Sequence, residues 1–457
     1  MAGIGFELRK SLKEDRLLSL AKVFGYSAVL SSGPWVISIL AIVLIGFINI
    51  ANMATASETV RFQIVVTYSI AFASSLIITG LVQVPYTRYV ADLLFIKRSD
   101  EVLPSYFGTI VAAWIVGLPV VIPFFRWIFA GESLFLVTGV VATFMVLCGV
   151  WISSILASSL KYYKEAVWSY LVSYVLIVAL SYLFGSSIER LILIFFTGNL
   201  LLLTLLMTYI IKSYGATRFL RFDFFFLPNF YWSLAFAGLF YNFGAWVDKF
   251  IFWYHPATGY DVIGKLHASA VYDMPIFLAY LSILPGMAVF FFRLESDFAQ
   301  KYDLYYDAVR SGATLHVIRK YRFEMVETIR HAIEEIIMIQ GIVDVALFLS
   351  APDLFDALHI SKLYLGLFYI LTVGAMLQMA FMAVLAILFY LDKRRKAMWL
   401  SLAFFLLNAA LTLASISMGP LFFGYGYTVS LLIVFLASLI VIRKEMQRLD
   451  YDTFMLQ

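Results

Sequence analysis

The sequence predicts an all-α, polytopic membrane protein with twelve transmembrane helices in two parallel six-helix halves and both termini in the cytoplasm. Three observations support this fold class: the composition, the number of long apolar stretches, and the distribution of basic residues along the chain. The 457 residues are 63% hydrophobic and only 14% charged, whereas a soluble domain contains about a quarter charged residues. This composition excludes an ordinary soluble protein.

An apolar stretch of about 20 residues is long enough to cross a bilayer as a helix. Such stretches recur along the whole chain, and the shortest connections between them are KYYKE (161–165) and SMGPLFF (417–423). Counting them gives twelve, which predicts twelve spans. The expected spans lie at about 24–48, 64–86, 105–129, 134–160, 166–184, 189–211, 230–252, 268–292, 331–350, 363–391, 399–418 and 420–442.

Basic residues alternate between rich and poor connections in step with these spans. If the N-terminus is inside, the inner segments hold 27 of the 33 Lys and Arg residues. Cytoplasmic segments of membrane proteins carry such an excess, so we expect both termini, the loop 293–330 and the DKRRK segment (392–396) in the cytoplasm. The basic residues left for the outer side are Arg61, Arg126, Arg190, Lys249, Lys265 and Lys362.

Residues 1–22 differ from the spans because they alternate apolar and charged side chains. Within the stretch IGFELRKSLKEDRLLSL (4–20), Ile4, Leu8, Leu12 and Leu18 fall near one helical face. A short amphipathic helix of this kind lies on a membrane surface rather than across it. We therefore predict an interfacial helix, with a solvated tail as the alternative.

Two short motifs indicate that the chain contains an internal duplication. GPWV (33–36) in the first span returns as GAWV (244–247) in the seventh, and RYVAD (88–92) returns as RLESD (293–297) at the end of the eighth. Repeated halves of six helices share one orientation and are common in transporters. The predicted organisation is residues 23–211 and 230–442 as halves, 212–229 as a cytoplasmic linker and 443–457 as a cytoplasmic tail.

Gly33, Pro34 and Gly244 mark where we expect the repeated helices to bend or pack closely. Proline removes a backbone donor and clashes with the preceding turn. Helices interrupted by Gly or Pro at matching places in two halves indicate the working cavity of a transporter. A structural kink without a mechanistic role is the alternative.

Three acids lie inside predicted spans, and we expect them to face a cavity. A charge at mid-bilayer costs about 2.5–3.5 kcal/mol on insertion scales. Asp344 lies deepest, whereas Asp248 and Asp273 are nearer the outer ends of their spans, with Lys249 beside Asp248. Three acids against one lysine would favour a cationic cargo or a coupling cation. Ion pairs or caps between helices are the alternative.

Two stripes of polar residues could line an aqueous path and bind sugar hydroxyls. Small polar side chains also join helices by hydrogen bonds, and this alternative remains open. The first stripe is Ser75, Thr79 and Gln83, and the second is Tyr170, Ser173 and Tyr174.

The longest polar segment, 293–330, is expected to be ordered and to form two helices broken at SGAT (311–314). It either packs on the core or docks a partner. Aromatic residues and arginine are enriched at protein interfaces, so we predict the main docking surface here. The candidate contacts are Tyr302, Tyr305, Tyr306, Arg319, Lys320 and Arg322.

None of the sequence motifs that could indicate an enzyme is complete. GYDVIGKL (259–266) resembles a P-loop but lacks the Ser or Thr that binds magnesium. DYD (450–452) stands alone in the tail, and the five histidines show no metal-binding spacing. We therefore expect no catalytic residue, no metal, no cofactor and no enzymatic activity.

Three stretches resemble one known family: MAGIGFELRK (1–10), SSGPWV (31–36) and YDMPIFLAYLSILPGMAVFFFRLESDF (272–298). They are similar to PelG, the inner-membrane transport component of the Pel exopolysaccharide system. The resemblance implies the multidrug/oligosaccharidyl-lipid/polysaccharide flippase superfamily, with twelve or more helices in two halves. It also implies a location in the bacterial inner membrane and a galactosamine-rich, partly deacetylated polymer as cargo.

The resemblance further implies a cytoplasmic glycosyltransferase and membrane partners that include a cyclic-di-GMP receptor. We expect no nucleic-acid partner. The function we predict is export of Pel exopolysaccharide, rich in galactosamine and N-acetylgalactosamine, through a cavity between the two halves. Two alternatives remain: a cation-coupled flippase of lipid-linked or small cargo, and a membrane scaffold that anchors the glycosyltransferase.

Overall fold

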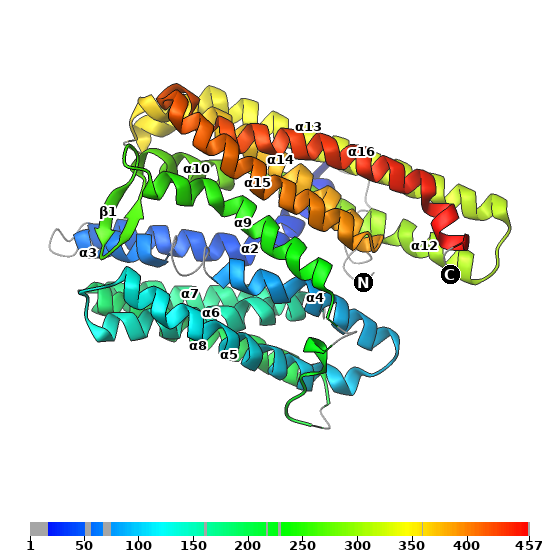
Figure 1. Cartoon of the computed structure of the whole chain (residues 1–457), viewed down its shortest axis with the longest axis horizontal. Helices are drawn as coiled ribbons and strands as arrows, with labels where there is room; N and C mark the ends of the chain where they lie inside the picture. The colour runs from blue at the N-terminus through cyan, green and yellow to red at the C-terminus, as the bar shows by residue number, and fades with distance from the viewer. Residues whose placement is uncertain are drawn as a thin grey trace. The chain divides into compact units, whose positions relative to one another are not determined.

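The computed structural model describes residues 17–50, 56–66, 75–159, 162–215, 218–226, 230–358 and 360–455, and these are mostly helical (Figure 1). The predicted all-α class is confirmed. Most of the predicted interfacial helix, residues 1–22, lies outside the described residues.

Each predicted span coincides with a helix or a pair of helices, although the second span is described only in part. The helices are α2 (Leu17–Ile50), α3 (Ala56–Ile64), α4 (Ser75–Phe95), α5 (Val102–Ile128), α6 (Leu134–Ser159), α7 (Tyr163–Phe184), α8 (Ile188–Ser213), α9 (Trp232–Tyr254), α10 (Ala270–Ser282), α11 (Leu284–Phe292), α12 (Ala299–Arg310), α13 (Leu315–Ala357), α14 (Leu365–Tyr390), α15 (Arg394–Met418) and α16 (Tyr425–Met455).

Within the described residues, seven helices are by themselves long and apolar enough to cross a membrane: α5, α6, α7, α8, α14, α15 and α16, some with a short flanking turn. The bent pair that begins with α10 and continues through α11 adds an eighth if it is counted as one span. These helices make the chain a multi-pass membrane protein. The remaining spans of the predicted twelve, and the cytoplasmic position of the termini, stay predictions.

The predicted helix breaks have clear local causes. The SGAT segment separates α12 from α13 as predicted, with Gly312 at a positive φ of 67°, a conformation that glycine adopts without steric cost. Gly419 has a φ of 103° just after α15 ends at Met418. These breaks support the division of the apolar sequence into separate helices.

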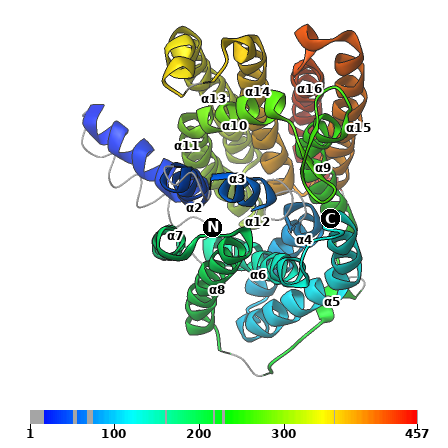
Figure 2. The same ribbon diagram turned by 90° about the vertical axis from the view of Figure 1, so that its left-hand side faces the viewer.

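The chain divides into two compact units. One unit contains α10 to α16, residues 247–251 of α9, and the part of α2 before Gly33. Within it, α14 packs against α13 and α16, and α15 packs against α16 (Figure 2). Its apolar core includes Val289 from α11, Ile336 from α13 and Met379 from α14.

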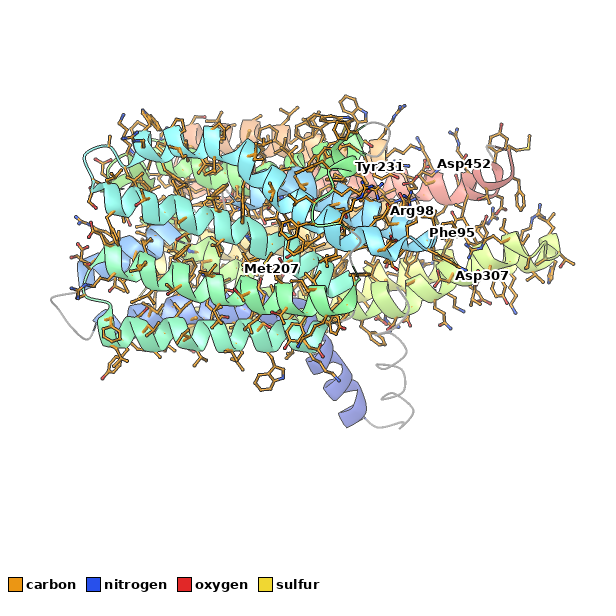
Figure 3. All side chains as sticks on the ribbon, turned by 90° about the horizontal axis from the view of Figure 1, so that it is seen from below. Phe95, Arg98, Met207, Tyr231, Asp307 and Asp452 are labelled. Atoms are coloured by element: carbon orange, nitrogen blue, oxygen red, sulfur yellow. The ribbon has the colours of Figure 1, made fainter. Side chains whose placement is uncertain are left out.

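The other unit contains α2 from Gly33, α3 to α8, α9 up to Trp246, and residues 252–269. The segment that follows α8 is fixed to α5 in this unit. The backbone N–H of Arg221 donates to the Pro104 carbonyl at 3.0 Å. The Arg221 guanidinium pairs with Glu101, which also pairs with Arg98, the residue labelled in Figure 3.

This division differs from the predicted halves, because residues 230–246 and 252–269 join the unit built from α2 to α8. Within that unit, α4 and α9 approach closely at one point. A Cβ atom on Gly238 would lie 2.4 Å from the Gly80 carbonyl oxygen, so only glycine permits this approach. Small residues commonly allow such close contact between membrane helices. The six-plus-six duplication stays a prediction.

The stretch that resembles a P-loop forms a β-hairpin instead. Strand β1 (Tyr260–Ile263) pairs antiparallel with β2 (Leu266–Ala268), and Gly264 occupies the turn with a φ of 56°. The Lys265 N–H donates to the Ile128 carbonyl at 2.6 Å, and its ammonium lies 4.7 Å from the centre of the Trp127 ring. The hairpin therefore caps the end of α5. A P-loop instead leads from a strand into a helix.

Candidate functional site

Two adjacent charged residues of α9 are buried together in the unit formed by α10 to α16. Asp248 is 0% exposed and Lys249 is 2% exposed. The Lys249 ammonium lies 3.0 Å from Asp248 Oδ2 and 3.2 Å from Oδ1. Burial of two charges is costly, and their attraction repays this cost only when further hydrogen bonds satisfy the remaining donors and acceptors.

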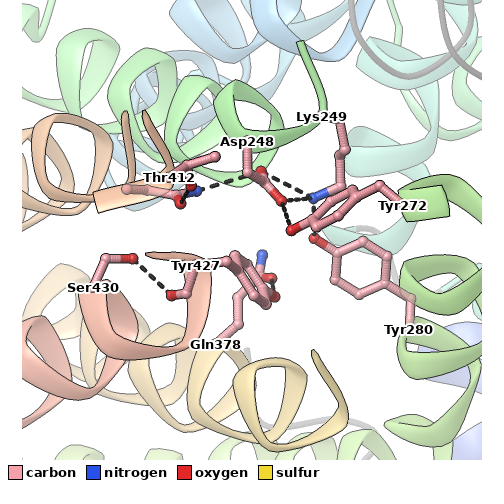
Figure 4. A network of polar contacts seen from close by, with 9 residues as sticks. Asp248, Lys249, Tyr272, Tyr280, Gln378, Thr412, Tyr427 and Ser430 are labelled. Carbon is pink, nitrogen blue, oxygen red and sulfur yellow. Dashed lines mark hydrogen bonds and ion pairs between the residues drawn. The ribbon is translucent and has the colours of Figure 1, made fainter. Parts of the chain in front are cut away.

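The Asp248 carboxylate receives hydrogen bonds from two other helices. Tyr272 of α10 donates its hydroxyl to Oδ2 at 2.5 Å, and Asn408 of α15 donates Nδ2 to Oδ1 at 3.3 Å. Thr412 in turn donates to Asn408 Oδ1 at 3.0 Å, which orients the amide. Figure 4 labels Asp248, Tyr272 and Thr412 of this arrangement. Both carboxylate oxygens therefore have neutral donors as well as the lysine.

The Lys249 ammonium is held by aromatic residues on its other sides. It donates to the Tyr280 hydroxyl at 3.0 Å. It also lies 5.0 Å from the centre of the Tyr280 ring and 5.2 Å from the centre of the Tyr427 ring, within the range of cation–π attraction. Tyr427 donates to Gln378 of α14. We call Asp248, Lys249, Tyr272, Tyr280, Gln378, Asn408, Thr412 and Tyr427 the α9 network (Figure 4).

The α9 network joins five helices through groups whose charges cancel. Lys249 neutralises Asp248 within the network, and the expected excess of acids over lysine in a cavity stays a prediction. Hydroxyls, amides and aromatic rings can bind sugars, but Asp248, Lys249, Tyr272, Asn408 and Tyr427 are all at most 2% exposed here. In this conformation the network is a closed polar cluster.

The other two acids lie in the same unit. Asp273 is in the first turn of α10 and is 8% exposed. Asp344 of α13 is 3% exposed and accepts a hydrogen bond from Gln340 at 2.7 Å. Among the residues that the structure describes, this is the single hydrogen bond of the Asp344 carboxylate. The expectation that all three acids face one cavity, with Asp344 deepest, stays a prediction.

The residues of the two predicted polar stripes lie in the other unit. Thr79 is fully buried and Gln83 is half-buried, while the side chain of Ser75 is outside those described. On α7, Tyr170 and Tyr174 are each at most 5% exposed. The hydroxyl groups of Tyr170 and of Ser154 on α6 are hydrogen-bonded, with 3.0 Å between their oxygens.

The second stripe therefore contacts both helices beside α7. The Tyr174 hydroxyl donates to Asn199 of α8 at 3.4 Å, and Ser173 is 0% exposed. Such contacts match the alternative interpretation, in which polar side chains join helices. A role in lining a path stays a prediction.

The predicted bend residues lie inside continuous helices. Pro34 is within α2, and the Ser38 hydroxyl donates to the Pro34 carbonyl at 2.9 Å. Gly33 and Gly244 are both buried. The division into compact units crosses α2 between residues 32 and 33, and crosses α9 between residues 246 and 247. The repeated motif thus lies where each helix passes from one unit to the other.

One predicted docking residue is wrong, because Tyr305 is 0% exposed. Its hydroxyl is within hydrogen-bond distance of two groups on α16: Asp450 Oδ1 at 3.2 Å and Thr453 Oγ1 at 3.4 Å. Burial raises the pKa of Tyr305 to about 12, so the phenol keeps its proton and its hydrogen bond. Arg322 pairs with the same Asp450 at 2.6 Å. These residues brace α12 and α13 against the end of α16.

The remaining candidates near this brace differ in exposure. Tyr302 and Tyr306 are half-buried, and their ring centres are 4.6 Å apart. Arg319 and Lys320 are exposed. The DYD acids are also engaged in ion pairs, since Asp452 pairs with Lys393. A docking role for the exposed residues stays a prediction.

Sequence reasoning missed most members of the α9 network: Tyr272, Tyr280, Gln378, Asn408, Thr412 and Tyr427. A usable signal was present for Asn408 and Gln378, because each is a single amide in a long apolar helix. Polar side chains at such positions usually bond across helices. The tyrosines gave no signal in a chain with 28 of them.

The described part of the chain contains no group of three or more His, Cys, Asp or Glu side chains that could hold a metal ion. Cys148 is buried. The site is therefore built from an ion pair, hydroxyls, amides and aromatic rings.

Comparison with known proteins identifies a family and a fold. The model of the PelG family, described as "Putative exopolysaccharide Exporter (EPS-E)", matches residues 1–454. No curated protein matches the chain.

Several solved transporters have a similar fold. The outward-facing conformation of a multidrug resistance MATE family transporter of the MOP superfamily has 11% identity and a TM-score of 0.64, covering 94% of this chain and 96% of that one. A MOP superfamily transporter from Pyrococcus furiosus Vc1 (DSM3638) has 11% identity and a TM-score of 0.62, with 93% and 96% covered. A MATE structure in the bent conformation has 12% identity and a TM-score of 0.61, also with 93% and 96% covered.

Proposed function

The chain belongs to the PelG family of exopolysaccharide exporters, and on this premise we propose that it exports Pel exopolysaccharide across the bacterial inner membrane. The observation that carries the proposal is the family match over residues 1–454. The MATE-like fold supports a transport role. Both the family and the similar structures are transporters, which is consistent with a protein that is not an enzyme.

The chemistry of the α9 network supports a neutral sugar polymer as cargo. Because Lys249 cancels the charge of Asp248, the network offers hydroxyls, amides and aromatic faces without a net charge. N-acetylgalactosamine units are uncharged, whereas free galactosamine units are cationic. We therefore propose that the polymer crosses mainly in its acetylated form, and that deacetylation follows passage.

A change of conformation at the repeated motif is the proposed means of opening the path. Solved MATE structures at 12% identity include a bent and a straight conformation. We propose that α2 bends at Gly33 and Pro34 and that α9 adjusts at Gly244. Movement of α9 would carry Asp248 and Lys249 with it, and so would open the α9 network toward the polymer.

We also propose that a cytoplasmic glycosyltransferase docks on the exposed part of the 293–330 segment, with a cyclic-di-GMP receptor as a further membrane partner. Arg319 and Lys320 are exposed, and Phe323 on the same helix is 65% exposed. A neighbouring apolar and basic surface of this kind suits a protein interface. Reversing both charges, with Arg319→Glu and Lys320→Glu, should weaken co-purification of the glycosyltransferase. Reversal of the exposed Arg330 is the matched control.

The proposed function can be tested in bacteria that make the polymer. Removal of this protein should abolish secreted polymer, and the full chain should restore it, while the glycosyltransferase stays abundant and membrane-bound. Loss of the glycosyltransferase from the membrane would instead favour a scaffold. Secretion at the normal level without this protein would overturn the proposal.

A second candidate is a cation-coupled flippase of lipid-linked or small cargo, which the likeness to multidrug MATE structures favours. Proteoliposomes that contain this chain alone separate the two candidates. Uptake of small cationic drugs driven by an ion gradient would support the second candidate. Absence of such uptake, together with loss of polymer export in cells, would support the first.

A further inference from the structure

Asp344 is a buried carboxylate whose hydrogen bonds are incomplete. It is 3% exposed, so it faces protein rather than lipid. Its Oδ1 accepts a hydrogen bond from Gln340 Nε2 at 2.7 Å. Its Oδ2 is buried and has no hydrogen-bond partner among the described residues. Buried polar atoms are nearly always satisfied, so this oxygen requires an explanation.

Gln340 connects Asp344 to the break between α10 and α11. The same Nε2 that binds Asp344 also donates to the Ser282 carbonyl at 3.0 Å, and Ser282 is the last residue of α10. Gln340 Oε1 is buried and likewise has no partner within the described residues. A Cβ on Gly286 of α11 would lie 2.8 Å from this oxygen, so both sides of the break contact Gln340.

The break itself follows from the sequence. Pro285 is in the first turn of α11, and proline has no N–H to offer the carbonyl four residues earlier. That carbonyl belongs to Leu281, and the next carbonyl, that of Ser282 at the end of α10, accepts a hydrogen bond from the Gln340 amide. The Gln340 Nε2 group thus donates one hydrogen bond to a carboxylate and one to a helix end.

Within the part of the chain that the structure describes, no ion pair brings a positive charge to Asp344. On α10, Tyr272 and Tyr280 belong to the α9 network, and Asp273 is at the opposite end from Ser282. Helix α11 carries no ionisable residue. On α14, Tyr369 donates to the Phe348 carbonyl and Tyr390 packs on Phe298 and Tyr302. Beyond α13, Lys362 pairs with Asp356.

An ionised carboxylate with one neutral partner is costly in an apolar interior. A proton removes this cost and also gives the carboxyl group a donor, because a protonated acid carries an O–H. Asp248 is neutralised by a lysine, whereas Asp344 has no such counter-ion among the residues that the structure describes. Two unsatisfied acceptors, Asp344 Oδ2 and Gln340 Oε1, lie on neighbouring turns of one helix.

We propose that Asp344 is a proton-binding site whose state is passed to the break between α10 and α11 through Gln340. In the bound state, one proton from water joins the carboxylate to give a neutral acid. When the proton leaves, the carboxylate attracts the Gln340 amide more strongly, and the hydrogen bond from Gln340 to Ser282 weakens. A coupling of this step to export rests on the proposed function, whereas proton binding does not.

Infrared spectroscopy of the purified full chain in lipid nanodiscs tests the site directly. A protonated carboxylic acid has a C=O band separate from that of a carboxylate. We expect such a band at mildly acidic pH, with loss on alkalinisation and absence in Asp344→Asn. Asp353→Asn is the matched control, because Asp353 is exposed on the same helix and its removal should leave the band unchanged.

Further variants keep the proposal falsifiable. If Asp344→Asn does not fold, Asp344→Glu should keep the band at a shifted frequency. Gln340→Met should keep the band but change its frequency, because the hydrogen-bonded amide is lost. A band that is absent from the wild type, or that persists unchanged in Asp344→Asn, would overturn the proposal.

A metal cation is the competing occupant, and a stability measurement distinguishes it. Replacing choline chloride by sodium or potassium chloride should leave the unfolding temperature of the wild type unchanged at constant ionic strength. A rise that Asp344→Asn abolishes would contradict proton binding and assign the site to that cation. Because neither measurement requires transport, failure here is distinguishable from failure of the exporter proposal.

Discussion

Asp248 and Asp344 are buried carboxylates in the same compact unit, yet their surroundings are opposite. Asp248 contacts a lysine ammonium, a tyrosine hydroxyl and an asparagine amide, whereas Asp344 contacts one glutamine amide. Burial alone therefore does not indicate what an acid does in a membrane protein. The number and charge of its donors separate an acid that holds helices together from one that exchanges a proton.

The largest effect should come from removing the counter-ion of Asp248. Lys249→Met leaves a buried carboxylate without its cation, and loss of one partner of a buried ion pair costs about 3–5 kcal/mol of unfolding free energy. Thermal unfolding in detergent measures the change. Lys362→Met, which removes an exposed lysine from its pair with Asp356, should have little effect because exposed ion pairs contribute little.

The double variant Asp248→Asn with Lys249→Met sharpens this test. It removes both charges, so it should be more stable than Lys249→Met alone. If the double variant is the less stable of the two, the ion pair is not what holds this region together.

A smaller effect should follow from removing one neutral donor to Asp248. In Tyr272→Phe the ring remains but the hydroxyl bond to the carboxylate is lost, and a hydrogen bond to a charged group contributes about 1.5–3 kcal/mol. Tyr182→Phe is the control, because Tyr182 is 70% exposed on α7. Equal unfolding temperatures for the two variants would show that Tyr272 adds nothing to the network.

The smallest effect on stability should be that of Asp344→Asn. The asparagine keeps the shape and the contact with Gln340, so we expect a change below about 1 kcal/mol, the scale of one neutral hydrogen bond. Polymer export should nevertheless fall, because the variant has no proton to exchange. A loss of protein from the membrane would place Asp344 with Asp248, as a residue that stabilises the fold.

The sequence predicted the helices well and the site only in part. Long apolar runs and short polar connections are local features, so the positions of α5 to α8 and of α14 to α16 followed from them directly. The SGAT break was equally readable, since glycine and small polar residues end helices. Asp248 and Asp344 stood out because a charge inside an apolar run has a known cost.

The partners of these acids could not be read in the same way. Tyr272 and Asn408 meet at Asp248 through helix packing, and no periodicity in the chain records which faces will touch. Tyr305 was misassigned to a docking surface for the same reason, because the end of α16 that covers it is distant in sequence. The close approach of Gly80 and Gly238 likewise joins residues that are distant in sequence.

Export of the polymer itself is tested most directly in inverted inner-membrane vesicles that contain this chain and the glycosyltransferase. Polymer made from a nucleotide sugar on the outer surface of these vesicles should enter the lumen and become protected from an added glycoside hydrolase. We predict protection with the wild-type chain, and much less with Asp344→Asn at an equal amount of protein. Complete digestion of the polymer with the wild-type chain, in sealed vesicles that still synthesise it, would contradict the account.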